Sequence, residues 1–298
     1  MQTARAQRLA VAALLAAALP WVAAPARAYD RVEWSPDWPR FRWTEGVATV
    51  GLLTASYIED SALTGPSTPH WTGPILLDGP IRGLLRGRSD HLQRVATKYA
   101  DVNLTLFTFF PYFDVALALG VHGSVDVAAQ MLLINAQSQS FTSSLTLLTK
   151  WAVGRQRPYV RDCSVAGVAG VHGCGTRYDN IGFFSGHTSA AFTGAALTCV
   201  HHAHLPLYGG GLPDSWACLW AMTGATTTAL LRIVSDDHYA SDVVMAAGVG
   251  LFSGYVLPSL LHYGFGRGVP AKRPGSAEVM PTLLPIEGGL GIGLAGSM

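Results

Sequence analysis

The chain has 298 residues, a formal net charge of +1 at pH 7, and a composition in which 49% of the residues are hydrophobic. A chain this close to neutral lacks the positive surplus that attracts nucleic acids, so we expect no nucleic-acid partner. The length is sufficient for one large hydrophobic core, or for one domain with a tail.

The N-terminus has the three parts of a secretory signal peptide. Arg5 and Arg8 form a basic start, which an apolar, alanine-rich run over residues 9–24 follows. Residues 26–28 (Ala-Arg-Ala) then provide a small-x-small cleavage site. An uncleaved membrane anchor is the alternative, which the shortness of the apolar run and its prolines disfavour. We therefore predict that residues 1–28 are removed and that the protein is exported, to the periplasm or another extracytoplasmic compartment.

The rest of the chain predicts an all-α fold, a helical bundle of about six core helices. Residues 29–45 are rich in tryptophan and proline, which predicts an irregular segment laid over the core. A short apolar stretch over residues 47–58 and a Gly/Pro-rich connection over residues 64–79 come next. Helical patterns follow at residues 80–100, 104–121, 127–153, 187–203, 215–234 and 238–262.

We divide the chain by these patterns into four parts. They are the signal peptide (1–28), an N-terminal segment packed on the core (29–94), the helical domain (95–263) and a C-terminal tail (264–298). The tail is rich in Gly and Pro at first, and residues 279–298 alternate enough to allow one or two short strands or a disordered end.

The four cysteines fit an oxidising compartment. Cys163 and Cys174 flank a loop rich in Gly and Val, which predicts a local disulfide. Cys199 and Cys218 fall on successive predicted helices, where they either form a second bridge or are small buried hydrophobes. Because their spacing matches no zinc ligand set, we predict no structural metal.

The sequence leaves the relation to a membrane open. Residues 104–121 and 239–261 are long enough to span one. If the bundle spanned, the turns at 122–126 and 204–214 would face the cytoplasm without any Lys or Arg, contrary to the positive-inside tendency. Polar residues inside the predicted helices, Asp114 and Asn135 among them, also suit water. These features favour a soluble or peripherally associated protein, with a membrane-spanning bundle as the alternative.

Three separate motifs supply the groups that hold and transfer a phosphoryl group. The first runs from Lys150 to Pro158 (KWAVGRQRP), and the second is Ser-Gly-His at residues 185–187. The third runs from Arg232 to Asp242 (RIVSDDHYASD). Together they contain three cations, a hydroxyl, a glycine amide, two imidazoles and a carboxylate, which predicts phosphoryl transfer through a histidine.

The spacing within each motif supports this interpretation. Lys150 and Arg157 are about two helical turns apart, so a helix would present both cations on one face. His238 and Asp242 are at i and i+4, so the carboxylate can reach one imidazole nitrogen and fix the tautomer. Gly186 lets an oxyanion approach the backbone, at the predicted start of a helix whose first amides would face the anion.

Residues beside the motifs carry weaker predictions. Arg155 lies five residues after Lys150 and so leaves the helical face of the two cations, which predicts a side chain in solvent. Asp236 and Asp237 directly precede a predicted helix, which favours roles as caps or first-turn acids. The histidines within residues 201–204 lie at a helix end, where exposure to solvent is the default expectation.

The order of the three motifs resembles the type 2 phosphatidic acid phosphatase superfamily, which also includes bacterial non-specific acid phosphatases and vanadium haloperoxidases. The resemblance covers roughly residues 95–262. Phe184 stands where Pro is common in the family, and Leu231 stands where Ser is common. Neither change removes a charged or proton-transferring group, so we still expect activity.

The resemblance implies a phosphatase that needs neither a metal nor another cofactor, because cations neutralise the phosphate charge. His238 would attack phosphorus and form a phosphohistidine, with Asp242 holding its reactive tautomer. His187 would protonate the leaving alcohol and then activate water. The remaining groups would bind the non-bridging oxygens: Lys150, Arg157, Arg232, the Ser185 hydroxyl and the Gly186 amide.

The sequence does not decide the substrate, which is a phosphomonoester or a lipid (di)phosphate. One rival function is a vanadium haloperoxidase, although the chain is short for that role and shows no extra region for a halide and peroxide pocket. The other is a non-catalytic helical bundle that binds lipid or a protein partner. The intact catalytic positions in all three motifs count against it.

Overall fold

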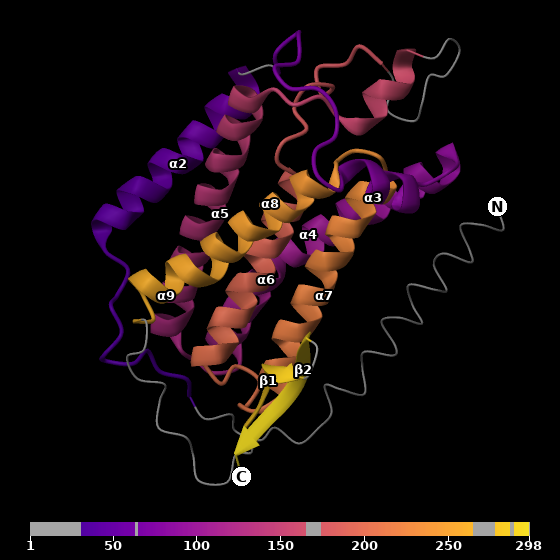
Figure 1. The fold of residues 1–298 in the computed structure, drawn as a ribbon. Helices are drawn as coiled ribbons and strands as arrows, with labels where there is room; N and C mark the ends of the chain where they lie inside the picture. Colours follow the sequence, from indigo (N-terminus) through magenta and orange to yellow (C-terminus); the bar gives the residue numbers. More distant parts are fainter. Residues whose placement is uncertain (1–30, 63–64, 165–173, 265–277, 287–288, 298) are drawn as a thin grey trace, which may run out of the picture. The chain divides into compact units, whose positions relative to one another are not determined.

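A computed structural model describes residues 31–62, 65–164, 174–264, 278–286 and 289–297. The predicted signal peptide, residues 1–28, lies outside the described residues. The described chain is an α-helical bundle, which confirms the predicted fold class, and strands β1 (Glu278–Ile286) and β2 (Gly289–Ser297) pair as an antiparallel hairpin in the tail. The helical elements are α2 (Trp43–Ala62), α3 (Asp78–Leu85), α4 (Asp90–Gly120), α5 (Val125–Val153), the 3-10 helix η2 (Pro158–Ser164), α6 (Gly186–His204), α7 (Leu212–Val234), α8 (Ala240–Leu251), the π-helical turn η3 (Phe252–Val256) and α9 (Leu257–Leu261) (Figure 1).

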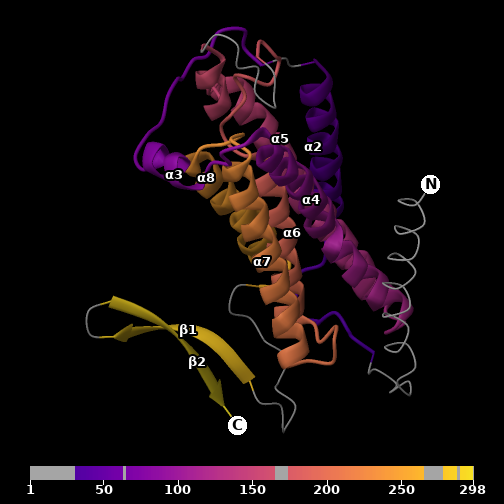
Figure 2. The ribbon, with the colours of Figure 1, turned by 90° about the vertical axis from the view of Figure 1, so that its right-hand side faces the viewer.

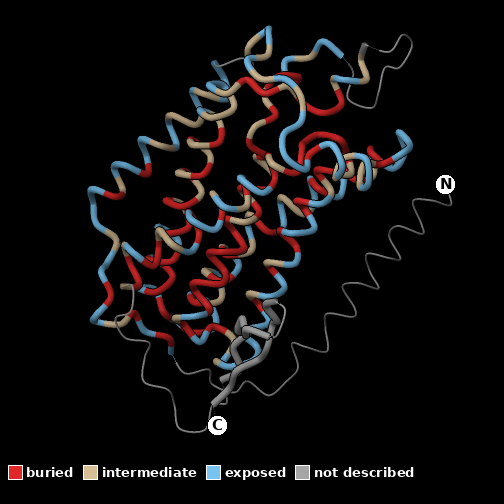
Figure 3. Tube along the Cα trace, viewed as in Figure 1, coloured by how far each residue is buried: buried red, intermediate tan, exposed pale blue. Residues whose placement is uncertain are grey.

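Helix α6 is the central helix of the bundle and contacts α4, α5, α7 and α8 (Figures 1 and 2). Small residues make this possible, because they let neighbouring backbones come close. A Cβ atom on Gly194 would lie 1.9 Å from the carbonyl oxygen of Phe107 in α4, so only glycine fits there. Figure 3 accordingly shows α6 as buried along most of its length.

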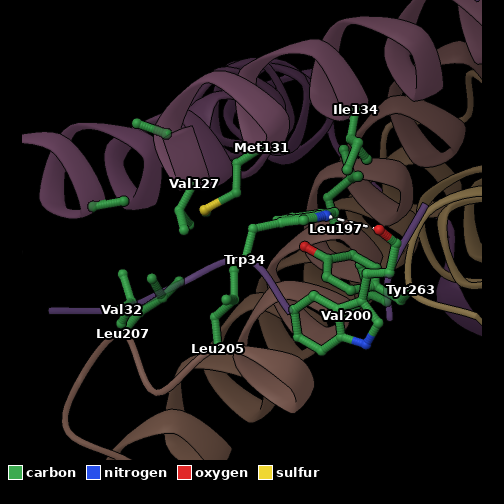
Figure 4. Packing of buried hydrophobic residues seen from close by; sticks show 13 residues of the cluster. Val32, Trp34, Val127, Met131, Ile134, Leu197, Val200, Leu205, Leu207 and Tyr263 are labelled. Carbon is green, nitrogen blue, oxygen red and sulfur yellow. Dashed lines mark hydrogen bonds between the residues drawn. The ribbon is translucent and has the colours of Figure 1, made fainter. Parts of the chain in front are cut away.

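The N-terminal tryptophan segment closes the end of the bundle at the C-terminus of α6. Trp34 and Trp38 are buried, and their rings lie 5.2 and 5.1 Å from the ring of Tyr263. Figure 4 shows Trp34 between Met131 of α5 and the side chains at the end of α6. Residues 32–42 are irregular and add Val32, Trp34 and Trp38 to the core, whereas α2 begins at Trp43.

The predicted helix boundaries between residues 80 and 121 are wrong, since α3 ends at Leu85 and α4 begins at Asp90. The sequence placed a break between helices over residues 80–100 and 104–121, but α4 runs without interruption from Asp90 to Gly120. Ser89 caps its start by accepting a hydrogen bond from Leu92 N at 3.2 Å. The weak helix formers at positions 101–103 therefore do not end the helix, because packing against α6 and α7 overrides local propensity.

Two disulfides are present. Cys163 is bonded to Cys174, as predicted, and this bridge links η2 to the chain that leads to α6. Cys199 is bonded to Cys218, so the second pair is a bridge between α6 and α7 rather than two free thiols. Both bridges fit the oxidising compartment that the predicted export implies.

The outer faces of the bundle are unusually apolar. Three described helical stretches are long and apolar enough to cross a membrane: Asp90–Gly120, Leu212–Val234 and Ala240–Leu261. Large apolar side chains on them are exposed, among them Phe109 (61%), Trp216 (63%) and Val244 (71%). Asp114, in contrast, is fully buried and accepts a hydrogen bond from the Tyr208 hydroxyl at 3.0 Å. Polar residues of these helices thus need not face the outside.

Candidate active site

The three motifs meet at one end of the bundle, where α5 and α7 finish and where α6 and α8 begin. Lys150 lies in the last turn of α5, and Arg232 lies in the last turn of α7. Residues 185–187 form the start of α6, and His238 occupies the turn into α8. The fold therefore brings together residues that are far apart in sequence.

The three cations lie close to one another, Lys150 half-buried and Arg157 and Arg232 buried. A Cβ atom on Gly186 would lie 3.2 Å from Lys150 Nζ, so the glycine leaves room for the ammonium group at the start of α6. Burial, and then repulsion from Arg157 and Arg232, lowers the pKa of Lys150 to about 7. Both guanidinium groups are also buried, and the Nε–H of each has no hydrogen-bond partner in the described chain. Buried donors without acceptors are costly, so this cluster suits an anion.

Asp237 joins the two arginines. Its carboxylate accepts a hydrogen bond from Arg157 Nη1 at 2.9 Å and lies 3.0 Å from Arg232 Nη2. The prediction that Asp237 is a helix cap is wrong, because Tyr239 occupies the cap of α8 instead. Asp236 is no cap either: it has a φ of 64°, and its carboxylate binds Arg82 of α3 at 2.7 and 2.6 Å. With Asp236 in this left-handed conformation, the carboxylates of Asp236 and Asp237 both bind arginines.

His238 is held with one ring nitrogen available. Its Nδ1 lies 2.7 Å from the carbonyl oxygen of Gly182, which can only accept, so Nδ1 carries the proton and Nε2 has a free lone pair. Burial, followed by the charges of Arg157 and Arg232, keeps the pKa of His238 well below its ordinary value. The ring is therefore neutral, as a nucleophile must be.

Asp242 lies beside His238 but does not make the hydrogen bond that fixes its tautomer. Asp242 Oδ2 is 3.7 Å from His238 Nδ1, beyond hydrogen-bonding distance. That oxygen accepts instead from Tyr239 N at 2.8 Å, and Oδ1 is paired with Arg155. The i, i+4 spacing thus brings the carboxylate close, while the Gly182 carbonyl sets the tautomer.

Ser185 and His187 flank the start of α6. The Ser185 oxygen accepts from Thr188 N at 3.4 Å and from Thr188 Oγ1 at 3.0 Å, so its own proton remains available to an anion. His187 Nε2 lies 2.8 Å from Asp101 Oδ1 of α4. Burial and the charge of Arg232 lower the pKa of His187 to about 4, against the opposing effect of Asp101.

Sequence reasoning did not identify Asp101 as part of the site. The available signal was that Asp101, like Asp114, is an acidic residue in the interior of a long, largely apolar helix. Only the packing of α4 against α6 shows which histidine it reaches.

The prediction that Arg155 faces solvent is wrong. Its side chain is 0% exposed and lies between the rings of Trp71 and Tyr239, with Cζ 3.9 and 4.5 Å from their centroids. The prediction continued the helical phase of α5 as far as residue 155. The helix ends at Val153, however, and Gly154 follows with a φ of 54°, which redirects the chain.

The expected exposure of the histidines at the end of α6 is also wrong for two of them. His201 is buried, with its ring nitrogens 2.6 Å from the Tyr263 hydroxyl and 2.8 Å from Asn135 Oδ1. His202 is buried between Asp114 and Asp214, which raise its pKa to about 9 against the effect of burial. Among the described residues, no group of three or more His, Cys, Asp or Glu side chains is arranged to hold a metal ion.

Comparison with known families decides the assignment. Residues 117–265 match the PAP2 superfamily, over a stretch that contains all three motifs. The chain belongs to the PAP2 superfamily. The resemblance seen in the motifs is thereby confirmed, and the activity of this superfamily is of the phosphatase type. No curated protein and no solved structure gives a match. Asp78 and Asp101 precede the stretch that matches the PAP2 superfamily.

Proposed function

We propose that this PAP2 protein is a metal-independent phosphatase that hydrolyses phosphomonoesters or lipid (di)phosphates through a phosphohistidine. The observation that carries the proposal is the cluster of Lys150, Arg157 and Arg232, in which the buried Nε–H groups of both arginines have no acceptor among the described residues. A phosphoryl group would supply oxygens to the two Nε–H groups and to the Ser185 hydroxyl. Three cations can neutralise its charge in the transition state without a divalent ion.

In the first step His238 Nε2 forms a bond to phosphorus while the bond from phosphorus to the ester oxygen breaks. The electron pair leaves with that oxygen, which takes a proton from the ring of protonated His187. The alcohol departs, and the phosphoryl group stays on His238 under the charges of the three cations. Asp101 holds the ring of His187 from the side of Nε2, which leaves Nδ1 for the transfer.

In the second step water attacks the phosphohistidine. His187, now neutral, takes a proton from the water as its oxygen bonds to phosphorus, and the bond to His238 Nε2 breaks. Inorganic phosphate leaves, His238 is again neutral and His187 is again protonated. The cycle uses one water and requires no oxidant, reductant or further cofactor.

Activity is expected to persist in excess chelator and to be inhibited by vanadate. The charge of the phosphoryl group is balanced by side chains, and vanadate can adopt the five-coordinate geometry of the transition state. The measurement is hydrolysis of an aryl phosphate in the presence of a chelator and across a vanadate titration. Complete loss of activity in chelator that a divalent ion restores would contradict the proposal. Bromination of a dye with vanadate and peroxide would instead favour the haloperoxidase.

Replacing Asp101 with asparagine is expected to shift the pH dependence of kcat/KM to lower pH. The Asp101 carboxylate raises the pKa of His187, so its removal lowers that pKa further. Because His187 must be protonated to donate to the leaving alcohol, kcat/KM for an alkyl phosphate would begin to fall at a lower pH. Asp126→Asn is the control, since Asp126 is exposed and pairs with Arg40 at 2.7 Å. Superimposable pH profiles for wild type and Asp101→Asn would rule out this role.

The exposed apolar faces support a lipid phosphate as the substrate and association with a membrane. Sequence reasoning favoured a soluble or peripheral protein partly because of Asp114, but that side chain faces the interior of the bundle. Phe109, Trp216 and Val244 are exposed on three different helices. Burying such side chains against acyl chains is favourable, at about 25 cal/mol per Å² of apolar surface.

The mature chain is expected to stay with the membrane fraction after an alkaline carbonate wash. It is also expected to hydrolyse a lipid phosphate in vesicles with a higher kcat/KM than a short-chain, water-soluble analogue. Both measurements need the full exported chain, with a known soluble exported protein as the fractionation control. Quantitative release by carbonate, together with equal kcat/KM for the two substrates, would contradict the lipid assignment and leave a soluble phosphomonoesterase.

A further inference from the structure

Arg155, Asp78 and Asp242 form a buried charged cluster next to His238. Arg155 Nη1 donates to Asp242 Oδ1 and, at 2.8 Å, to Ser241 Oγ, while Nη2 donates to Asp78 Oδ2 at 2.7 Å. Asp78 in turn accepts from the backbone N of Ser241 at 2.8 Å and from its hydroxyl at 2.7 Å. The first turn of α8 is therefore held by two residues, Arg155 in the segment after α5 and Asp78 at the start of α3.

Arg155 also binds Gly182, the residue whose carbonyl oxygen accepts the hydrogen bond from His238. Its own carbonyl oxygen accepts from Gly182 N at 2.7 Å, and the Gly182 carbonyl accepts from His238 Nδ1 at 2.7 Å. Arg155 is thus linked to the His238 ring in two ways, through Gly182 and through Asp242. Its backbone positions the carbonyl that fixes the tautomer, and its side chain positions the Asp242 carboxylate beside the same nitrogen.

We propose that Arg155 and Asp78 are positioning residues for His238, and that they act through Asp242 and the first turn of α8. This inference rests on the proposed phosphatase function. Neither side chain is assigned a part in the reaction, because the polar side-chain contacts of Arg155 and Asp78 are with Asp242, Ser241 and each other. Asp78 lies in α3, before the residues that match the PAP2 superfamily, so the N-terminal segment contributes to the catalytic geometry.

A purely structural role is the alternative, because removing one partner of a buried ion pair destabilises the fold. The two roles differ in what they change. A nucleophile displaced by about 1 Å loses roughly 10²-fold in rate, while binding of the phosphoryl group by Lys150, Arg157 and Arg232 is retained. If the role were purely structural, each variant would instead lose activity only to the extent that it is unfolded, so activity would rise and fall with the melting temperature.

The test compares Arg155→Met, Arg155→Lys, Asp78→Asn and the double variant Asp78→Asn/Arg155→Met. We expect Arg155→Met to lower kcat by about 10²-fold, with KM and the inhibition constant of inorganic phosphate little changed. Lysine keeps the charge but cannot pair with both carboxylates, so Arg155→Lys is expected to recover kcat only in part. The double variant is expected to be more stable than Arg155→Met, because it contains one unpaired buried carboxylate fewer, while its kcat stays low.

Asp214→Asn is the matched control. It makes the same change in another buried carboxylate, the partner of His202 at the opposite end of α6, and is expected to lower the melting temperature without changing kcat per folded molecule. The ¹⁵N NMR signal of His238 Nδ1 provides a readout independent of turnover. The Gly182 carbonyl is expected to keep the Nδ1–H tautomer in both proteins, while the Nδ1 chemical shift is expected to change in Arg155→Met, because the nearby Asp242 carboxylate loses its partner.

Several outcomes would overturn the inference. A kcat of Arg155→Met within about twofold of wild type would do so, as would a kcat that recovers with stability in the double variant. An unchanged His238 Nδ1 chemical shift in Arg155→Met would also count against it, even if the protein proved not to be a phosphatase. Failure of the proposed function would show separately, as a wild-type chain that hydrolyses no phosphate ester.

Discussion

Replacing His238 with alanine is expected to lower kcat by at least about 10⁴-fold, for aryl and alkyl phosphates alike. The ring is neutral and buried, and its tautomer leaves Nε2 as the available nucleophile. Alanine offers no group to accept the phosphoryl group, and water would have to attack the ester directly. The measurement is steady-state kcat, with the inhibition constant of phosphate to show that the cations remain in place.

His91→Ala provides the control for this substitution. His91 is an exposed histidine near the start of α4, and its replacement is expected to leave kcat unchanged. If His238→Ala kept more than about a hundredth of the wild-type kcat, His238 would not be the nucleophile.

Replacing His187 with alanine is expected to have an effect that depends on the leaving group. A general acid contributes about 10²–10⁴-fold when the departing oxygen needs a proton, and much less when that oxygen is a stable phenolate. We therefore expect a loss of that size for alkyl phosphates and a loss of less than about tenfold for a nitrophenyl phosphate. The measurement is kcat for a series of esters whose leaving groups differ in pKa.

The slope of that series distinguishes the two histidines. In wild type, log kcat is expected to depend weakly on the pKa of the leaving group, and in His187→Ala it is expected to depend steeply. Equal losses for alkyl and aryl esters would show that His187 does not protonate the leaving oxygen. His238→Ala is the reference, because its loss is expected to be independent of the leaving group.

Much of the site could be predicted because its residues lie within short, regular elements. Lys150 and Arg232 come from the last turns of two helices, and Ser185 and Gly186 form the start of a third. Local spacing therefore indicates which side chains share an end of the bundle. The helical periodicity that gave the fold class rests on the same regularity.

Three of the wrong predictions concern residues in or beside the turns between helices. Arg155 was placed by continuing a helix that ends two residues earlier, and the left-handed Gly154 reverses the expected direction of its side chain. Asp237 was interpreted as a cap because local sequence does not show that two arginines converge on it. His238 and Asp242 have the spacing for a hydrogen bond, but the carbonyl of Gly182, more than fifty residues earlier, makes that bond instead.

Burial could not be predicted for polar residues within apolar helices. Asp114 and Asn135 suggested contact with water, but both are buried in hydrogen bonds with Tyr208 and His201. A polar residue in an otherwise apolar helix is compatible with either face, because its partner comes from a different helix. Only the packing of α4 and α5 against α6 determines the direction.

Trapping the covalent intermediate tests the central claim most directly. The full chain would be mixed with a substrate carrying a labelled phosphoryl group, quenched within one turnover in alkali, and digested for peptide mapping. We expect label on the peptide that contains His238, stable in alkali and lost in acid, as a phosphoramidate bond requires, and no label in His238→Ala. An active enzyme that yields no labelled protein, or a label that survives acid or lies on another residue, would contradict a mechanism that passes through His238.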